Sequence, residues 1–318
     1  MRRILVSGGT GFLGSYLVRK LVEGYDIDHV VVITTNVKNR TSLDILQVNS
    51  PRLKLIGGDV RNYDFLQRLF SEYEFDTVFH LAAQSEVRKC QVNAKLAYDT
   101  NISGTVNLLE VARLYGKVTS IVVSSSDKAY GPSSQLPYLE DHHLNGNGVY
   151  EVSKSCQDII ARSYSTNYDL PVAVTRCSNL YGGGDTNYSR VIPNTIRRIR
   201  ENKSPVIWTG AREFVREFLY VEDAVSAYLA IAETIDVTKG NAYNVGSGEQ
   251  ITIGDLVTKI LHKMSSDIQI EYRERVFPEI SHQYLDSSKL KSDTDWVAKT
   301  LLDDGLEKTI AMHEDGAS

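Results

Sequence analysis

The sequence of 318 residues lacks the features that mark membrane and secreted proteins. No apolar run approaches the roughly 20 residues that span a bilayer. The first residues lead into a short strand-like run rather than a secretory leader. The three cysteines (Cys90, Cys156 and Cys177) are widely spaced and form no CxxC pair, so neither a disulfide framework nor a zinc site is predicted. We therefore expect a cytoplasmic protein without a membrane partner.

An excess of positive charge is also lacking. The chain has 35 Lys and Arg against 40 Asp and Glu, a formal net charge of −5. Binding to a nucleic-acid backbone needs clustered Lys and Arg, so we expect no nucleic-acid partner. The adjacent pair His142 and His143 lies in a Gly- and Asn-containing loop. Neighbouring histidines point in different directions, so we expect no metal site.

What the first half contains is an alternation of short β-branched runs and amphipathic segments. We predict strands at Ile4–Ser7, Val30–Thr34, Leu53–Ile56, Thr77–His80, Ser120–Ser124 and Val172–Thr175. We predict helices at Phe12–Gly24, Asp64–Tyr73, Asn101–Tyr115 and Val149–Tyr168. Nearly continuous apolar character is typical of strands buried on both faces. The alternation predicts an α/β fold, a Rossmann-type doubly wound parallel sheet.

The alternation loosens after residue 178. We expect a dinucleotide-binding domain over residues 1–178 and a smaller C-terminal substrate-binding lobe over 179–318. Roughly residues 212–245 are expected to thread back onto the first domain. The predicted elements of this part are helices near Val191–Arg200, Asp223–Glu233 and Ile253–Met264, and strands near Pro205–Ile207 and Phe214–Val221.

A glycine-rich turn follows the first predicted strand. Gly8, Gly11 and Gly14 are spaced G-x-x-G-x-x-G, and a predicted helix begins at Phe12. Such a turn lets backbone N–H groups approach a pyrophosphate at a helix N-terminus, where the helix dipole favours anions. Its position between a strand and a helix predicts a dinucleotide site formed by these glycines with Phe12 and Leu13.

The end of the second strand lacks the carboxylate that commonly binds the adenosine ribose. The chain instead has Thr35 and Asn36, followed by Lys38 and Arg40. NAD could bind through Asn36 or Thr35, and a 2′-phosphate of NADP could contact Lys38 or Arg40, so NAD is expected and NADP stays open.

The turn after the third strand offers a further contact for the cofactor. Gly58, Asp59 and Val60 follow that strand directly. This position could place Asp59 near the adenine amino group, for which a carboxylate is a suitable acceptor.

Residues 150–154 read Tyr-Glu-Val-Ser-Lys at the head of a predicted helix. The i, i+4 spacing places Tyr150 and Lys154 on one helix face. A nearby ammonium and a nicotinamide cation would lower the pKa of the phenol from about 10 towards neutrality. Tyr150 could then take a proton from an alcohol while hydride leaves for the cofactor.

These motifs stand in the order typical of one family. The chain resembles the extended short-chain dehydrogenases/reductases of the nucleotide-sugar epimerase/dehydratase kind over essentially its whole length. The motifs in family order are Gly8–Gly14, His80–Gln84, Asn101 with Gly104 and Thr105, Ser124–Ser126, Tyr150 with Lys154, Arg176–Gly182 and Arg216–Asp223.

The resemblance implies roles for individual residues. Ser126, Tyr150 and Lys154 would be the catalytic trio, with Ser126 bound to a substrate hydroxyl and Lys154 to the nicotinamide ribose. The further contacts that the resemblance implies are Leu81, Ala82 and Ala83 with the cofactor, and Gln84, Asn179, Arg216 and Arg275 with the substrate. A diphosphate needs guanidinium or N–H donors, which is consistent with the last three.

Asp127 and Lys128 follow the catalytic serine, where family 4-epimerases usually have small or neutral residues. This pair and the turn Gly182–Asp185 resemble the NDP-hexose 4,6-dehydratases, especially those similar to CDP-glucose 4,6-dehydratase. Asp127 would be the acid that protonates the leaving 6-hydroxyl, and Lys128 the base that removes the C5 proton. Alternatively, Lys128 pairs with Asp127 or another carboxylate and transfers no proton.

The resemblance therefore favours a nucleotide-sugar 4,6-dehydratase that uses NAD. A 4-epimerase, and a non-catalytic dinucleotide-binding protein, are the alternatives. Family members commonly dimerise through two helices per subunit, and the segments Asn101–Tyr115 and Val149–Tyr168 are the candidates here.

Overall fold

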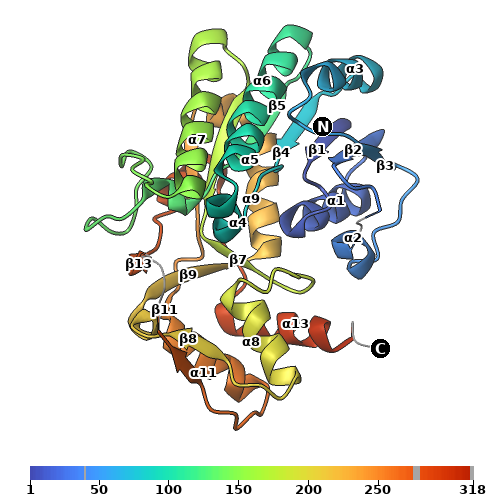
Figure 1. Cartoon of the computed structure of the whole chain (residues 1–318). Helices are drawn as coiled ribbons and strands as arrows, with labels where there is room; N and C mark the ends of the chain where they lie inside the picture. The colour runs from blue at the N-terminus through green and yellow to red at the C-terminus, as the bar shows by residue number, and fades with distance from the viewer. Residues whose placement is uncertain (39–40, 275–279, 316–318) are drawn as a thin grey trace.

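A seven-stranded parallel sheet forms the centre of the first lobe of this computed structural model, which describes residues 1–38, 41–274 and 280–315. Figure 1 shows the sheet above a smaller second lobe. Across the sheet, the strands are β10 (Ala242–Val245), β6 (Val172–Cys177), β5 (Ser120–Ser124), β4 (Thr77–His80), β1 (Arg3–Ser7), β2 (His29–Thr34) and β3 (Leu53–Gly57).

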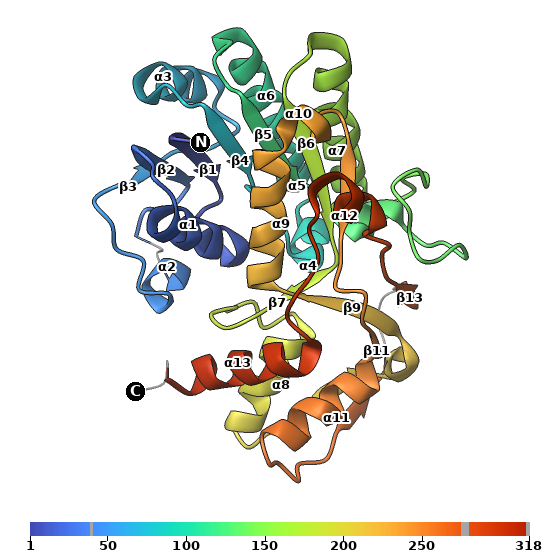
Figure 2. The ribbon, with the colours of Figure 1, turned by 180° about the vertical axis from the view of Figure 1, so that it is seen from behind.

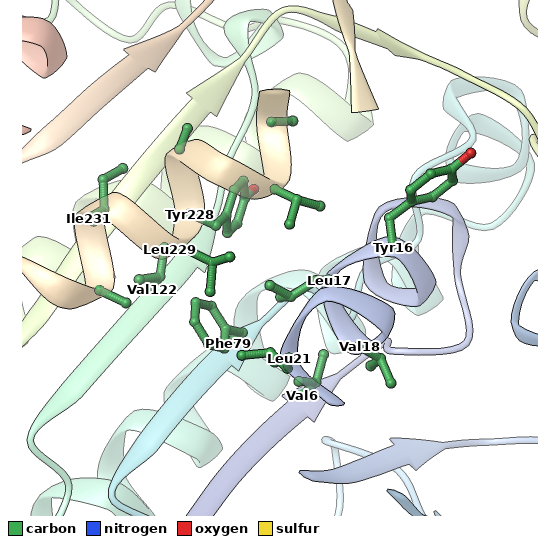
Figure 3. Close-up of a cluster of buried hydrophobic side chains, with 14 of the residues drawn as sticks. Val6, Tyr16, Leu17, Val18, Leu21, Phe79, Val122, Tyr228, Leu229 and Ile231 are labelled. Carbon is green, nitrogen blue, oxygen red and sulfur yellow. The ribbon is translucent and has the colours of Figure 1, made fainter. Parts of the chain in front are cut away.

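Helices cover both faces of this sheet (Figures 1 and 2). One face carries α3 (Tyr63–Tyr73), α6 (Gly104–Tyr115) and α7 (Val149–Tyr168), and the other carries α1 (Phe12–Gly24) and α9 (Val221–Glu233). Successive side chains of β1 point to opposite faces of the sheet. Val6 packs in the core beneath α1 and α9, whereas Leu5 packs beneath α3 and α6. Figure 3 shows the first of these cores, with Phe79 and Leu229 close to Val6.

The shorter helices of the first lobe lie beside the sheet and its connections. They are α2 (Thr41–Ile45), α4 (Val87–Val92), α5 (Ala94–Tyr98), α10 (Ile235–Thr238) and α12 (Ser288–Thr294). A π-helical turn, η1 (Asp99–Ser103), leads into α6, and a 3₁₀ turn, η2 (Asp127–Tyr130), follows β5.

The second lobe has its own small sheets and core. Its strands are β7 (Asn179–Tyr181), β8 (Val206–Trp208), β9 (Val215–Tyr220), β11 (Gln250–Thr252), β12 (Glu271–Arg273) and β13 (His282–Gln283). Its helices are α8 (Val191–Arg200), α11 (Ile253–Lys263), α13 (Leu302–Asp315) and a short turn, η3 (Ala211–Glu213). Strand β9 pairs with β7, β11 and β13, so residues far apart in the sequence meet beside the cleft.

The predicted fold class and the six predicted strands of the first sheet are confirmed. The seventh strand, β10, was not predicted; it pairs with β6 although it follows the second lobe's first strands in the chain. Helix α6 begins at Gly104 rather than at Asn101, because η1 occupies the preceding residues. Within the segment 212–245, helix α9 and strand β10 belong to the first lobe, whereas β9 lies in the four-stranded sheet of the second lobe.

Among the described residues, no helix is both long and apolar enough to cross a membrane. The same residues contain no cluster of His, Cys, Asp and Glu that could hold a metal ion. All three cysteines are free. The reducing, cytoplasmic setting stays a prediction from the sequence.

Candidate active site

A cleft of about 2040 Å³ runs between the two lobes, along the carboxyl ends of the parallel strands. The strand order reverses between β1 and β4, because the chain continues from β1 to β2 on one side and β4 lies on the other. In open α/β sheets, ligands bind at such a reversal, outside the carboxyl ends of the strands. The cleft is therefore where a ligand is expected, and most of the residues singled out from the sequence line it.

The glycine turn forms the floor of one half of the cleft. Gly8 has φ +75°, and a Cβ on it would lie 2.9 Å from the backbone nitrogen of Ala82. A Cβ on Gly14 would lie 2.3 Å from the carbonyl oxygen of Gly8. The turn is thus closed to side chains, whereas α1 begins at Phe12 without a side-chain cap and leaves its first N–H groups available. These residues fit a dinucleotide pyrophosphate.

A buried network fixes the two strand ends around this turn. Ser7 Oγ lies 2.7 Å from His80 Nδ1, and His80 Nε2 lies 2.9 Å from Thr105 Oγ1. Burial lowers the pKa of His80 to about 3, so this imidazole stays neutral. The backbone N–H groups of Leu81 and Ala82 donate to Ser7 Oγ. Leu81 and Ala82, with Ala83, line the cleft as the resemblance implies.

At the far end of this half, Thr34, Thr35, Asp59 and Val60 line the cleft. The Asp59 carboxylate accepts from the guanidinium of Arg61 at 2.6 and 3.0 Å, which lowers the pKa of Asp59.

The cofactor contact expected from Asn36 stays a prediction. Asn36 does not line the cleft; it is exposed, and its Oδ1 accepts from the backbone N–H of Lys38 at 3.1 Å. Arg40 lies outside the described residues.

Tyr150 lies at the start of α7 with its side chain 9% exposed in the cleft wall. Burial raises the pKa of its phenol, and hydrogen bonding with Ser126 opposes this rise. The expected fall towards neutrality is therefore not seen in the chain alone, because burial outweighs the groups that lower the pKa, which include Ser126 and Arg190. The ammonium of Lys154 donates to Ser124 O at 2.6 Å and to Gln157 Oε1 at 2.8 Å.

Lys154 is 3% exposed, and burial lowers its pKa to about 8. Gln157, which lies one turn further along α7, also donates to Thr105 Oγ1 at 2.9 Å. The Lys154 ammonium is thereby tied to the same buried network as His80. It is held in the cleft wall near the end of β5, where a ribose hydroxyl could replace one of its acceptors.

Asp127 is 2% exposed and follows Ser126 directly. Its Oδ1 accepts from Ser126 Oγ at 3.0 Å, whereas Oδ2 has no hydrogen-bond partner among the residues that the structure describes. Burial raises the pKa of this carboxyl, and Lys128, Ser126 and Arg216 partly offset the rise. Asp127 therefore keeps its proton to a higher pH than an exposed aspartate does.

Lys128 is half-buried and forms no ion pair within 4.0 Å in the described part of the chain. Its ammonium donates instead to Gln283 Oε1 on β13, at 3.5 Å. Gln283 is fully buried, and its Nε2 has no partner among the described residues. The structural ion pair considered for Lys128 is therefore not formed, and a neutral amide faces the ammonium.

Of the predicted substrate residues, Asn179 on β7 and Arg216 on β9 belong to the second lobe, whereas Gln84 follows β4 of the first lobe. Gln84, Asn179 and Arg216 line the cleft. Asn179 Nδ2 donates to Glu217 O at 3.1 Å. Arg216 is 4% exposed and donates to the carbonyl oxygens of Val215 and Ser281 at 2.9 and 3.1 Å. Arg216 thus holds the segment before β13 as well as facing the cleft.

Arg275, the other arginine expected at the substrate diphosphate, lies outside the described residues. The cleft residues missed from the sequence include Ser178, whose buried Oγ has no partner among the described residues, and Arg190. Gln283, which accepts from the Lys128 ammonium, was missed as well. Ser178 lies within the Arg176–Gly182 motif and Arg190 follows the Gly182–Asp185 turn by five positions, whereas Gln283 had no sequence signal.

Comparison with known proteins is consistent with this geometry. Residues 5–309 match the family model described as GDP-mannose 4,6 dehydratase. The chain belongs to this family. It is therefore an extended short-chain dehydrogenase/reductase of the nucleotide-sugar dehydratase/epimerase class.

Relatives within the family differ in the reaction they catalyse. The chain is 31% identical to a dTDP-glucose 4,6-dehydratase of Streptomyces griseus, over 98% of this chain and 93% of that one. A dTDP-glucose 4,6-dehydratase from Bacillus anthracis, solved with NAD, superposes with a TM-score of 0.89 at 28% identity, covering 99% and 97% of the two chains. A UDP-glucose 4-epimerase from Thermotoga maritima, solved with UDP-glucose, gives 0.91 at 26% identity and 99% coverage of both.

Proposed function

We propose that this protein is an NDP-hexose 4,6-dehydratase that uses NAD. The substrate would be oxidised at C4, lose water across C5 and C6, and be reduced at C6 to an NDP-4-keto-6-deoxyhexose. CDP-glucose is the first substrate to test, because Asp127, Lys128 and the Gly182–Asp185 turn resemble enzymes acting on it. The class of enzyme rests on the family; the reaction and the substrate are our proposal.

The observation that carries the reaction is the state of Asp127. A buried carboxyl with a raised pKa and an unpartnered oxygen in the cleft can donate a proton to a leaving hydroxyl. A 4-epimerase moves a hydride off C4 and back and expels no hydroxyl, so it needs no such acid. Lys128, close by and without a carboxylate partner in the described chain, could remove the C5 proton once C4 is a ketone.

The other residues would act on C4. Ser126 would bind the 4-hydroxyl, and Tyr150 would take its proton. NAD, when bound, would accept the hydride and return it. Because burial raises the Tyr150 pKa in the chain alone, a positive charge placed beside the phenol would favour its deprotonation.

The cofactor and the assembly are proposed on separate grounds. The glycine turn fits a dinucleotide, and the solved relative from B. anthracis contains NAD. NADP stays open because Arg40 is not described. A homodimer through α6 and α7 is proposed from the family resemblance and from the exposed apolar side chains Leu114, Ile159 and Tyr168 on these helices. A solution mass of one chain would contradict it.

Incubation of the purified protein with a panel of UDP-, CDP-, GDP- and dTDP-hexoses tests the reaction. Mass spectrometry should find a product lighter by one water from one nucleotide. Lys128→Met should abolish this product, or reduce it by about 10²–10⁴-fold, because it removes the base. Lys89→Met, which changes a lysine outside the cleft on α4, is the matched control and should retain the activity.

A product of unchanged mass but altered stereochemistry at C4 would identify a 4-epimerase and contradict the proposal. That alternative retains support from the epimerase of T. maritima, which superposes over 99% of the chain. Full dehydratase activity in Lys128→Met would refute the role of Lys128 while leaving the reaction intact.

A further inference from the structure

The turn from Gly182 to Asp185, after β7, packs against the first turns of α1. Tyr16 Oη donates to the carbonyl oxygen of Gly183 at 2.9 Å. A Cβ on Gly182 would lie 2.6 Å from Val221 Cγ1 and 3.4 Å from the ring of Phe12. The turn can approach this closely because its three glycines, Gly182–Gly184, carry no side chains. A second-lobe segment is therefore fixed onto the helix that begins at the dinucleotide turn.

Arg190 extends from this segment back over α1. Asp185 is 1% exposed, and its Oδ2 accepts from Arg190 Nη1 at 2.9 Å. The Arg190 guanidinium lies over the ring of Phe12, 5.8 Å from its centroid. Arg190 lines the cleft, and its other guanidinium N–H groups have no protein partner in residues 1–38, 41–274 and 280–315. A buried carboxylate thus orients a guanidinium that still has donors to offer.

Most of the other cations that line the cleft have protein partners elsewhere. Arg61 pairs with Asp59, Lys154 donates to Ser124 O and Gln157, and Arg216 donates to backbone carbonyls. Lys128 donates to Gln283, and Arg88 lines the cleft from α4. The first turn of α1 contains no Lys or Arg of its own. Among the described lining residues, Arg190 is the cation recorded in contact with that turn.

We propose that Arg190 binds a phosphate of the bound dinucleotide and, held by Asp185, acts as a clasp from the second lobe that slows cofactor release. A guanidinium forms charge-assisted, two-pronged hydrogen bonds with phosphate, which complement the backbone N–H groups of the glycine turn. Slow release of the cofactor would not slow the proposed reaction, because the cofactor is reduced and reoxidised within each turnover and need not leave. The inference rests on the dinucleotide binding proposed above.

The rate at which the NAD-loaded protein releases its cofactor tests the clasp. The loaded protein is diluted, and the NAD that remains bound is measured over time after rapid gel filtration. Arg190→Gln should release NAD about ten- to a hundredfold faster, because charge-assisted hydrogen bonds are lost. Arg190→Lys should fall between, since it keeps the charge without the fork. Salt should accelerate release from the wild type more than from Arg190→Gln.

Arg197→Gln is the matched control on the same helix, α8. Arg197 stacks on Tyr188 at 4.3 Å and does not line the cleft, so release should keep its wild-type rate. Asp185→Asn should accelerate release less than Arg190→Gln does, because the guanidinium remains but is less well oriented. If Arg190→Gln does not fold, the release rate of Arg190→Lys still decides.

Wild-type release from both Arg190 variants would overturn the clasp, and so would an equal effect of Arg197→Gln. A raised KM for the nucleotide sugar with unchanged NAD release would also overturn it, by assigning Arg190 to the substrate's diphosphate. Failure of the proposed reaction is separate: NAD would bind and be clasped, but no dehydrated product would form.

Discussion

The two halves of the cleft present different kinds of groups to a ligand. In the cofactor half, seven consecutive residues, Gly8–Gly14, offer backbone atoms and the start of a helix. In the substrate half, Asp127 and Lys128 follow β5, Arg216 lies on β9 and Gln283 on β13. Backbone recognition depends on the absence of side chains in one short segment, whereas side-chain recognition depends on segments that only folding brings together.

The largest effect on cofactor binding is expected from adding a side chain to the glycine turn. Gly14→Ala places a Cβ 2.3 Å from Gly8 O, a backbone atom that cannot move without displacing the turn. We expect NAD to bind about 10- to 100-fold more weakly, with a lower melting temperature, because overpacking is costly where the backbone is fixed. Titration of the cofactor-free protein with NAD and thermal unfolding measure the two effects.

Gly24→Ala is the control, because it changes a glycine at the other end of the same helix. Its Cβ would meet only the side chain of Lys20, at 3.8 Å, so NAD affinity should be unchanged. Wild-type affinity in Gly14→Ala would mean that the turn is not the pyrophosphate site.

This contrast explains how much the sequence alone could predict. The six strands and the glycine turn were predicted because period and spacing are local properties. Strand β10 was missed, since its four residues form a strand only by pairing with β6, whose paired residues lie 68 positions earlier.

The same distinction holds within the site. Tyr150 and Lys154 could be predicted from their helical spacing, and Ser126 from its motif. That the Lys154 ammonium donates to Ser124 O and Gln157 could not be predicted, because it depends on how α7 packs against β5. Gln283 is 155 positions from Lys128, and no sequence period connects residues at that separation.

The next prediction compares two carboxyl groups whose pKa values are shifted in opposite directions, Glu217 on β9 and Asp59 in the cofactor half. Glu217 on β9 accepts from the backbone N–H groups of Gly248 and Leu285 at 2.6 and 3.0 Å, and burial raises its pKa to about 7 from an ordinary 4.5. The folded state therefore holds a proton that the unfolded state has lost between these values. The stability that this proton confers is complete below about pH 4.5 and is lost as the pH rises through about 7.

Glu217→Gln should remove this pH dependence. The free energy of unfolding of the wild type should fall by on the order of 1–3 kcal/mol more than that of the variant between pH 5 and pH 8. Denaturant unfolding at both pH values measures it. A smaller dependence of the unfolding free energy on pH should remain in the variant, because the pKa of Asp127 is raised as well.

The exposed Glu222→Gln is the control and should keep the wild-type slope. In the cofactor half, Arg61 lowers the pKa of Asp59, so the contribution of Asp59 is lost as the pH falls and has the opposite sign. An unchanged slope in Glu217→Gln would place the titrating group elsewhere.

The smallest effect is expected at Asn36, where the sequence suggested a contact with the adenosine ribose. Its side chain is exposed and closes a local turn with Lys38 N. Asn36→Ala should therefore change NAD affinity by less than about threefold, as is usual for surface substitutions. Thr34→Val, which alters a hydroxyl that lines the cleft and lies 3.3 Å from Thr10 Oγ1, should weaken binding more. A tenfold loss in Asn36→Ala would show that this side chain turns towards the bound cofactor, so that recognition in the cofactor half also depends on a side chain that moves.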